Sequence, residues 1–206
     1  MNDTSVPDIV VGRLPLYLRS LQRMRQEGHQ VTSSQELGEV LGISAAQIRK
    51  DLSQFGEFGK QGTGYNIEYL CEQIQIILKV DRVWDVAVIG AGDIGSALAR
   101  YQGFTNRGFR VSMVFDSNPR KIGQQEGSHI IQDTAKMGEV IKEAGVKIAM
   151  IAVPVDQAQR VADQLIEAGV KAILNYAPTS ISVPKDTCLQ HIDPTTHLQH
   201  MTYYLN

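Results

Sequence analysis

Four residues between Gly90 and Asp116 have the types and spacing needed to bind a dinucleotide. Gly90, Gly92 and Gly95 form a G-x-G-x-x-G pattern directly after the apolar run Val86–Ile89. Such glycines allow a tight turn, let backbone N–H groups approach a pyrophosphate, and let the following helix pack closely on the strand. Asp116 ends the next apolar run, where an acidic residue hydrogen-bonds the adenosine ribose. The pattern therefore predicts a site for an adenine dinucleotide.

The acidic residue also bears on which dinucleotide is bound. A carboxylate at Asp116 repels a 2′-phosphate, so NAD(H) is favoured over NADP(H). Arg120 and Lys121 keep the alternative open, because cations so close to Asp116 could hold that phosphate. The helix after the glycines is expected to direct its positive N-terminus at the pyrophosphate. The residues expected to contact the coenzyme here are Gly90, Ala91, Gly92, Asp93, Ile94, Gly95, Asp116 and Lys121.

Apolar runs and helical stripes alternate after Asp116. Met137–Ile141 and Ala158–Ile166 have helical spacing, whereas Ile148–Val153 and Val170–Asn175 are strand-length apolar runs. Repeated strand–helix units predict an α/β fold with a Rossmann-type, doubly wound parallel sheet. Ligands of such sheets lie beyond the carboxyl ends of the strands, so the loops that follow should border the nicotinamide half. These loops add Val153, Pro154, Asn175, Ala177 and Pro178 to the predicted coenzyme site.

Two short helices joined by a glycine are predicted near the N-terminus. Ser33 with Glu36 and Ser44 with Gln47 each form a capping-box pattern, and Gly42 separates them. This arrangement is typical of a helix-turn-helix. Glycines between aromatic and polar residues then follow at 55–65 and predict a β-hairpin. A helix-turn-helix followed by a hairpin is the winged-helix arrangement.

The second of these helices has a polar face suited to DNA. With Ile48 at the centre of the buried side, helical periodicity turns the small and polar residues outward. Arginine and lysine can bond guanine or phosphate, and glutamine can recognise adenine. The alternative is an ordinary solvated helix face. The residues predicted to bind DNA are Ser44, Ala46, Gln47, Arg49, Lys50, Ser53, Lys60 and Gly62.

Length and composition fit one large domain or two modest ones. The chain has 206 residues, of which 43% are hydrophobic, and a net charge of −2, so any contact with nucleic acid must come from local patches. We expect a winged-helix domain with a connector helix at 1–80, a nucleotide domain at 81–192 and a terminal helix at 193–206. His197 and His200 have no evident carboxylate or thiol partner, so no metal site is expected. The absence of an apolar signal segment predicts a cytoplasmic protein.

The motifs described above, together with residues 13–17 and 192–193, resemble those of the Rex family of redox-sensing transcriptional repressors, and the resemblance covers essentially the whole chain. It implies an N-terminal winged helix, a Rossmann domain that binds NAD(H), and a homodimer with swapped C-terminal helices. It also implies binding to inverted-repeat operator DNA with NAD⁺ and release with NADH. The matching stretches are 13–17, 44–64, 90–95, 115–116, 121–123, 153–154, 169–178 and 192–193.

The same resemblance implies a switch. By position, Arg13, Tyr101 and Asp193 match family residues that link the nicotinamide end, the swapped helix and the DNA-binding domain. NAD⁺ carries a positive nicotinamide ring whereas that of NADH is neutral, and we hypothesise that Asp193 and Tyr101 sense this difference and change the dimer angle. Two recognition helices must enter major grooves about 34 Å apart, so a modest rotation would abolish the fit.

Two other functions are weighed against a repressor. An NAD-dependent oxidoreductase with an added helical domain needs an acid/base group near the reacting carbon. Tyr101 and Tyr176 have no obvious basic partner, and His129 and His191 are expected in loops or at the surface, so no catalytic residues are predicted. The third reading is a nucleotide- or coenzyme A-binding module without a DNA function.

Overall fold

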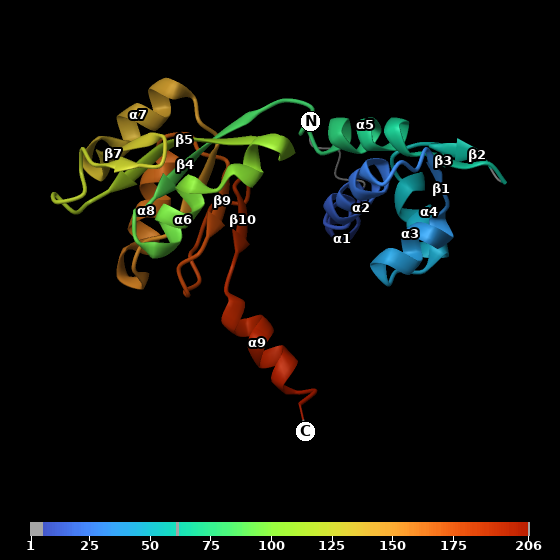
Figure 1. Cartoon of the computed structure of the whole chain (residues 1–206). Helices are drawn as coiled ribbons and strands as arrows, with labels where there is room; N and C mark the ends of the chain where they lie inside the picture. The colour runs from blue at the N-terminus through green and yellow to red at the C-terminus, as the bar shows by residue number, and fades with distance from the viewer. Residues whose placement is uncertain (1–5, 61, 206) are drawn as a thin grey trace. The chain divides into compact units, whose positions relative to one another are not determined.

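The computed structural model describes residues 6–60 and 62–205 and divides into two compact units, Met1–Arg82 and Val83–Asn206 (Figure 1). Each unit has a hydrophobic core of its own. Within the described ranges, no helix has both the length and the apolar character needed to cross a bilayer.

The first unit combines helices with a three-stranded antiparallel sheet. In chain order its elements are α1 (Asp8–Val11), α2 (Leu14–Gln26), β1 (Val31–Thr32), α3 (Ser34–Leu41), α4 (Ala45–Ser53), β2 (Gly59–Lys60), β3 (Gly64–Asn66) and α5 (Ile67–Ile77). In the sheet, β3 lies between β1 and β2. Tyr17, Leu21, Leu37, Ile48 and Leu70 are fully buried and join the helices into one core. The helix pair α3–α4 followed by the β2–β3 hairpin confirms the predicted winged helix.

Both helices of the helix-turn-helix begin at a serine. Ser33 Oγ accepts the N–H of Glu36 at 3.1 Å, and the Glu36 carboxylate accepts the N–H of Ser33 at 2.9 Å, which confirms the first capping box. Ser44 Oγ accepts the N–H of Gln47 at 3.2 Å. The Gln47 side chain instead donates to Asp51 Oδ1 at 2.7 Å, because a charged carboxylate is a stronger partner than a backbone N–H. The second capping box is therefore only half formed, and the prediction of a complete box is wrong.

The second unit is a seven-stranded sheet with helices on both faces. Its elements are β4 (Trp84–Ile89), α6 (Asp93–Arg100), η1 (Gln102–Arg107), β5 (Phe109–Asp116), β6 (Gln125–Glu126), β7 (His129–Asp133), η2 (Thr134–Lys136), α7 (Met137–Ala144), β8 (Ile148–Ile151), α8 (Val155–Glu167), β9 (Ala172–Asn175), β10 (Cys188–His191) and α9 (Pro194–Thr202). The strand order is β10-β9-β8-β4-β5-β7-β6, parallel except for β6. The chain winds outward from β4 through β5 to β7, then returns beside β4 and winds outward again from β8 to β10. This is the predicted doubly wound Rossmann sheet, and its direction reverses between β4 and β8.

The two faces of the sheet are covered by different helices. Ala87 and Ile89 of β4 pack with α7 and α8, whereas Val86 and Val88 pack with α6 and η1. The alternation follows from the opposite directions of successive side chains along a strand. Because both faces are covered, the strands are apolar on both sides, as in other buried parallel sheets.

Two features of this unit differ from what the sequence predicts. Residues 117–128, all of which the structure describes, connect β5 to β7 through turns and the short β6 rather than a helix. His129 was expected in a loop or at the surface but lies half-buried in β7, whereas His191 lies in β10 and is exposed, as expected. Neither β7 nor β10 is a continuous apolar run, so pairing with β5 and with β9 rather than local pattern defines them.

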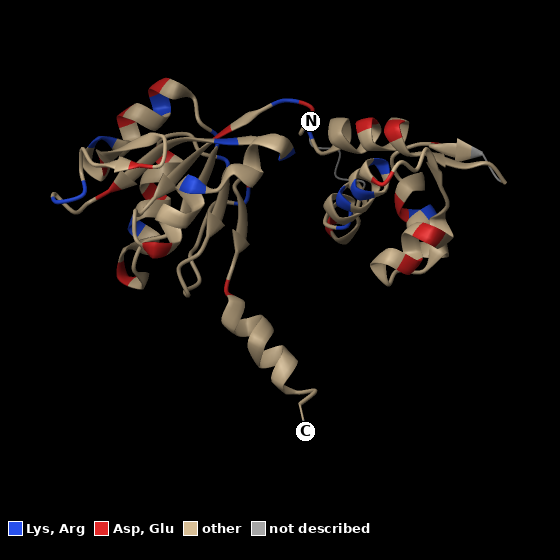
Figure 2. Cartoon of the chain, in the orientation of Figure 1, with Lys and Arg blue, Asp and Glu red and all other residues tan. Residues whose placement is uncertain are grey.

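The terminal helix α9 buries none of its residues. Figure 2 shows that it carries none of the four charged residue types, and Figure 1 shows it extending from the end of β10. Leu198 and Met201 are each 60% exposed on it. A helix so free of charge and so exposed offers an unpaired apolar surface.

Candidate functional site

The turn after β4 depends on its glycines. Gly90 has φ +96°, and its N–H donates to the carbonyl of Phe115 at 2.7 Å, which ties the turn to β5. A Cβ at Gly90 would collide with the backbone of Ala152, and one at Gly95 would collide with the carbonyl of Gly90, whereas the space beside Gly92 is open. The turn thus packs tightly on its protein side and is open where a pyrophosphate would lie, so these residues fit a dinucleotide.

A cleft of about 440 Å³ opens at the point where the sheet reverses direction. Gly90 and Gly92 border it from the turn after β4, and Val153 and Pro154 border it from the turn after β8. Ligands of open α/β sheets bind in this crevice. The complete lining is Gly90, Gly92, Asp116, Ser117, Asn118, Lys121, Thr134, Ala135, Ala152, Val153, Pro154, Gln157, Arg160, Val161 and Gln164.

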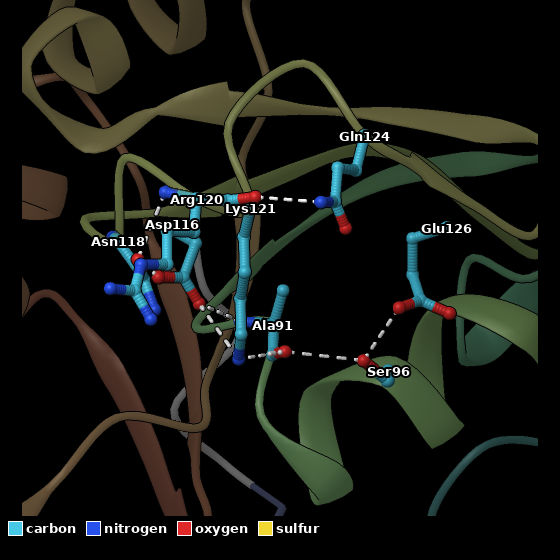
Figure 3. Close-up of polar contacts among 8 residues, drawn as sticks. All are labelled: Ala91, Ser96, Asp116, Asn118, Arg120, Lys121, Gln124 and Glu126. Carbon is cyan, nitrogen blue, oxygen red and sulfur yellow. Dashed lines mark hydrogen bonds and ion pairs between the residues drawn. The ribbon is translucent and has the colours of Figure 1, made fainter.

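Asp116 lies at the edge of this cleft and is held by backbone donors (Figure 3). Its Oδ2 accepts the N–H of Ala91 at 2.8 Å, and its Oδ1 accepts the N–H of Asn118 at 2.7 Å. Lys121 Nζ lies 3.9 Å from Oδ2 and donates to the carbonyl of Ala91 at 2.8 Å. The lysine therefore joins the acidic residue to the glycine turn. The Asp116 side chain is 13% exposed and keeps lone pairs for a further donor.

A second polar group supports the start of α6. Ser96 Oγ donates to Glu126 Oε2 at 2.7 Å, and Arg100 Nε lies 3.2 Å from Glu126 Oε1 (Figure 3 shows the Ser96–Glu126 bond). Ser96 is 8% exposed, so its hydroxyl needs such a partner. These bonds tie α6 to β6 and so fix the helix that follows the glycine turn.

The residues predicted beyond the other strands fall into two groups. Val153 and Pro154 line the cleft, whereas Asn175 and Ala177 are buried beneath their loop, at 0% and 4% exposure, and Pro178 is exposed. Asn175 Nδ2 donates to the carbonyl of Thr179 at 2.9 Å, and its Oδ1 accepts the N–H of Ala177 at 3.0 Å. The Asn175 side chain thus shapes the loop from within.

Sequence reasoning missed a wall of the cleft. Gln157, Arg160 and Gln164 line it from α8, and Thr134 lines it from η2. The three α8 residues are spaced three and four apart and therefore share a helix face. The spacing of these residues is visible in the sequence, but the polar face of an amphipathic helix is ordinarily assumed to face solvent.

The exposed side of α4 carries most of the residues predicted to bind DNA. Ser44, Ala46, Arg49, Lys50 and Ser53 are exposed, and Gln47 is partly buried. Gly62 lines a groove of about 610 Å³ between α4 and the hairpin. The side chain of Lys60 lies outside the described part of the structure.

Arg49 forms one side of that groove. Its Nη1 donates to Ser34 Oγ at 2.9 Å, and Ser34 begins α3. The groove is bordered by Ser33, Ser34, Arg49, Gly59, Gly62, Gly64 and Tyr65. Small residues and a tethered guanidinium at the base of a hairpin suit contact with a nucleic-acid backbone.

Asp51 is the charged residue that sequence reasoning overlooked on α4. It is 1% exposed and accepts hydrogen bonds from Arg13, Tyr17 and Gln47. Burial raises its pKa, but these three donors outweigh burial, so the pKa lies below its ordinary value. The same network raises the pKa of Arg13 through its bond to Asp51, and burial followed by the bond to Asp51 raises the pKa of Tyr17.

The three switch residues each have a partner close in the chain or in their own unit. Arg13 is bonded to Asp51, and the Tyr101 ring packs against Phe104 at a centroid distance of 4.9 Å. Asp193 accepts the N–H of Thr195 at 2.9 Å and so caps α9. Across the described residues, no cluster of three or more His, Cys, Asp or Glu side chains could hold a metal ion.

Comparisons with known proteins match both units. A family described as "CoA binding domain" matches residues 81–179, and one described as "Putative DNA-binding protein N-terminus" matches residues 5–53. The redox-sensing transcriptional repressor Rex of Chloroflexus aggregans is 55% identical over 97% of this chain and 94% of its own. Rex 1 of Thermotoga maritima is 44% identical over 96% of this chain and 95% of its own.

Solved structures agree with these matches. The crystal structure of RSP in complex with β-NAD⁺ and operator DNA has a TM-score of 0.94 and 38% identity, covering 99% of this chain and 94% of that one. RSP in complex with β-NADH has a TM-score of 0.90 and 36% identity, covering 99% and 96%. RSP is described as a Rex-family repressor. Because sequence relatives and solved structures both match over nearly the whole chain, the chain belongs to the Rex family of redox-sensing transcriptional repressors.

Proposed function

We propose that this chain represses transcription by holding inverted-repeat operator DNA in its NAD⁺ form and releasing it when NADH binds. The observation that carries the proposal is the cleft at the reversal point of the sheet, which has open space beside Gly92 and the carboxylate of Asp116 at its edge. The same chain exposes a basic recognition helix. Relatives named as redox-sensing repressors, and the RSP complexes with NAD⁺, NADH and operator DNA, support the assignment.

The proposed coenzyme contacts are the glycine-turn residues, Asp116, Lys121 and the loops that contain Val153, Pro154 and Asn175 to Pro178. The bound coenzyme would supply a ring whose charge depends on its oxidation state. The chain's own residues bind and orient it: Asp116 accepts from ribose hydroxyls, and the N–H groups of the turn face the pyrophosphate. A carboxylate beside the ribose also disfavours a ribose phosphate, which argues for NAD(H) over coenzyme A within the matched "CoA binding domain" family.

The proposed organisation is a winged helix at 1–80, a coenzyme domain at 81–192 and a dimerising helix at 193–206. The uncharged, exposed surface of α9 supports insertion into a second copy of the chain. In that dimer, Arg13, Tyr101 and Asp193 would connect the nicotinamide end with the DNA-binding unit. A repressor of this kind acts where the DNA is, and we place it in the cytoplasm.

A gel-shift titration tests the proposal. Inverted-repeat DNA is titrated with the protein at fixed total coenzyme while the NADH/NAD⁺ ratio is raised, and the fraction of bound DNA is expected to fall. Lys50→Ala on α4 should abolish binding, whereas Lys142→Ala, an exposed lysine of α7, should leave it unchanged. Binding that is indifferent to the ratio, or equal loss in both variants, would contradict the proposal. An Asp193→Ala protein that still releases DNA with NADH would exclude Asp193 from the switch.

A further inference from the structure

All acceptor positions of the Asp51 carboxylate are occupied by hydrogen bonds from neighbouring side chains. Arg13 donates to it through Nε at 2.5 Å and through Nη2 at 2.7 Å. Tyr17 Oη donates at 2.6 Å, and Gln47 Nε2 donates at 2.7 Å. A carboxylate has about four lone-pair sites, so these four bonds saturate it. Asp51 therefore offers nothing to DNA directly and acts only on the side chains around it.

The contact with Asp51 fixes the orientation of one amide on the recognition helix. Gln47 and Asp51 lie one turn apart on α4, and Gln47 is only partly buried. An ionised carboxylate can only accept, so the amide must turn its nitrogen toward Asp51, because its oxygen would be repelled. One N–H of Gln47 is then committed. The oxygen and the second N–H remain for a partner outside.

The oxygen and the second N–H of the Gln47 amide match adenine better than guanine. In the major groove, adenine presents an acceptor at N7 and a donor at N6, whereas guanine presents two acceptors, N7 and O6. One oxygen and one N–H complement adenine. Bidentate contact with guanine needs both N–H groups of the amide, and Asp51 holds one of them.

We propose that Asp51 is a positioning residue that makes Gln47 select adenine over guanine, with Arg13 and Tyr17 holding the carboxylate in place. The inference rests on the proposed DNA-binding function and names a specificity determinant within it. It assigns no DNA contact to Asp51 itself.

Selection from a library of randomised inverted repeats tests the idea with full-length protein. In Asp51→Ala, the preference for adenine over guanine at one symmetric position should fall on the order of 10-fold, because one bidentate contact loses its discrimination. Gln47→Ala should lose the preference at that same position, and the double variant should be no worse there than Gln47→Ala. The matched control is Asp163→Ala, since Asp163 accepts from Gln159 one turn away on α8 at 2.8 Å and lies outside the cleft lining.

The outcomes distinguish a failure of the proposed role of Asp51 from a failure of the proposed DNA-binding function. A wild-type protein that enriches no sequence overturns the proposed function and the inference with it. A wild-type protein that selects a site, together with Asp51→Ala that keeps every base preference or changes a position other than that of Gln47→Ala, overturns the inference alone.

A measurement on the wild-type protein covers the case in which Asp51→Ala fails to fold. NMR signals of the Gln47 side-chain amide are assigned by their loss in Gln47→Ala, and hydrogen exchange is followed for its two protons. One proton should exchange more slowly than the other, because it is held by Asp51. Equal, fast exchange of both protons would overturn the inference.

Discussion

The two units each contain a carboxylate at the centre of a polar network, and the two networks differ in what they leave free. Asp51 is 1% exposed and is surrounded by side chains from α2, α4 and the residue before α2. Asp116 is 13% exposed, is held mainly by backbone N–H groups, and faces a cleft. We call the Asp51 network closed, because all acceptor positions of its carboxylate are occupied. We call the Asp116 network open, because its carboxylate faces the cleft on one side.

A structural carboxylate and a ligand-binding carboxylate differ in which of their acceptor positions are already occupied. A saturated, buried carboxylate stabilises its neighbours and fixes their orientation, and removing a partner leaves a charge that water cannot reach. A carboxylate held by the backbone at the edge of a cleft is already positioned without side-chain partners, so a ligand can add to its bonds. We expect substitutions around Asp51 to change stability and those at Asp116 to change affinity.

The largest effect is expected on removing the cation beside Asp51. Arg13→Ala leaves the buried carboxylate without its charged partner and should lower the free energy of unfolding of the first unit by roughly 3–5 kcal/mol. Arg23→Ala on α2 is the control, because the Arg23–Glu27 pair is exposed and should contribute about 0.3–0.5 kcal/mol. Urea denaturation followed by circular dichroism measures both. Equal, small losses in the free energy of unfolding of the two variants would show that the Asp51 network does not stabilise the unit.

The next effect is expected on coenzyme affinity. Asp116→Ala removes a charged acceptor of ribose hydroxyls and should weaken NADH binding by about 10- to 100-fold, the equivalent of roughly 1.5–3 kcal/mol. Asp85→Ala is the control, since Asp85 lies at the opposite end of β4 in an exposed pair with Arg110. Titration of NADH fluorescence gives both dissociation constants. Unchanged affinity in Asp116→Ala would remove Asp116 from the site.

The closed network should also make stability depend on pH at both extremes. The pKa of Asp51 is lowered on folding, so its contribution is complete above the unfolded value of about 3.9 and is lost as pH falls through the lower folded value. The pKa of Tyr17 is raised, so its contribution is complete below about pH 10 and is lost as pH rises further. Urea midpoints measured across pH should fall at both ends. Tyr17→Phe should flatten the alkaline side, and it should also weaken the acid side in part because Asp51 loses one of its three donors. A uniform profile in both proteins would contradict the assignment.

The smallest effect is expected at the exposed ion pair beside the open network. Arg100 is 62% exposed where it meets Glu126, so Arg100→Ala should cost less than about 1 kcal/mol in the free energy of unfolding. Differential scanning calorimetry would detect the shift. A loss as large as that of Arg13→Ala would erase the distinction between a surface pair and the closed network.

Much of the fold and the coenzyme turn could be predicted from the sequence because local rules govern them. Any side chain at Gly90 or Gly95 would collide with the backbone, whereas Gly92 leaves open space beside the turn. The apolar runs of β4, β5 and β8 are buried on both faces and so are unambiguous. The helix-turn-helix likewise follows from caps at Ser33 and Ser44, which are contacts within a single turn.

The parts that could not be predicted depend on contacts between distant residues. Arg13 and Asp51 are 38 positions apart, and only the packing of α2 on α4 shows that they meet. Gln47 was read as an outward residue of a capping box, but a carboxylate one turn on binds its amide. The wall of the cleft formed by α8 was missed for the same reason: a polar helix face is indistinguishable from a solvated one until the sheet places a cleft against it.

The most direct test of the contrast is to measure both carboxylate variants against both ligands. Asp51→Ala and Asp116→Ala are each assayed for NADH affinity and, in the absence of NADH, for base preference on operator DNA. We predict that Asp116→Ala weakens NADH binding and keeps the base preference, whereas Asp51→Ala loses the adenine preference and keeps NADH affinity. Equal impairment of both ligands by either variant would contradict the separation of a closed network from an open one.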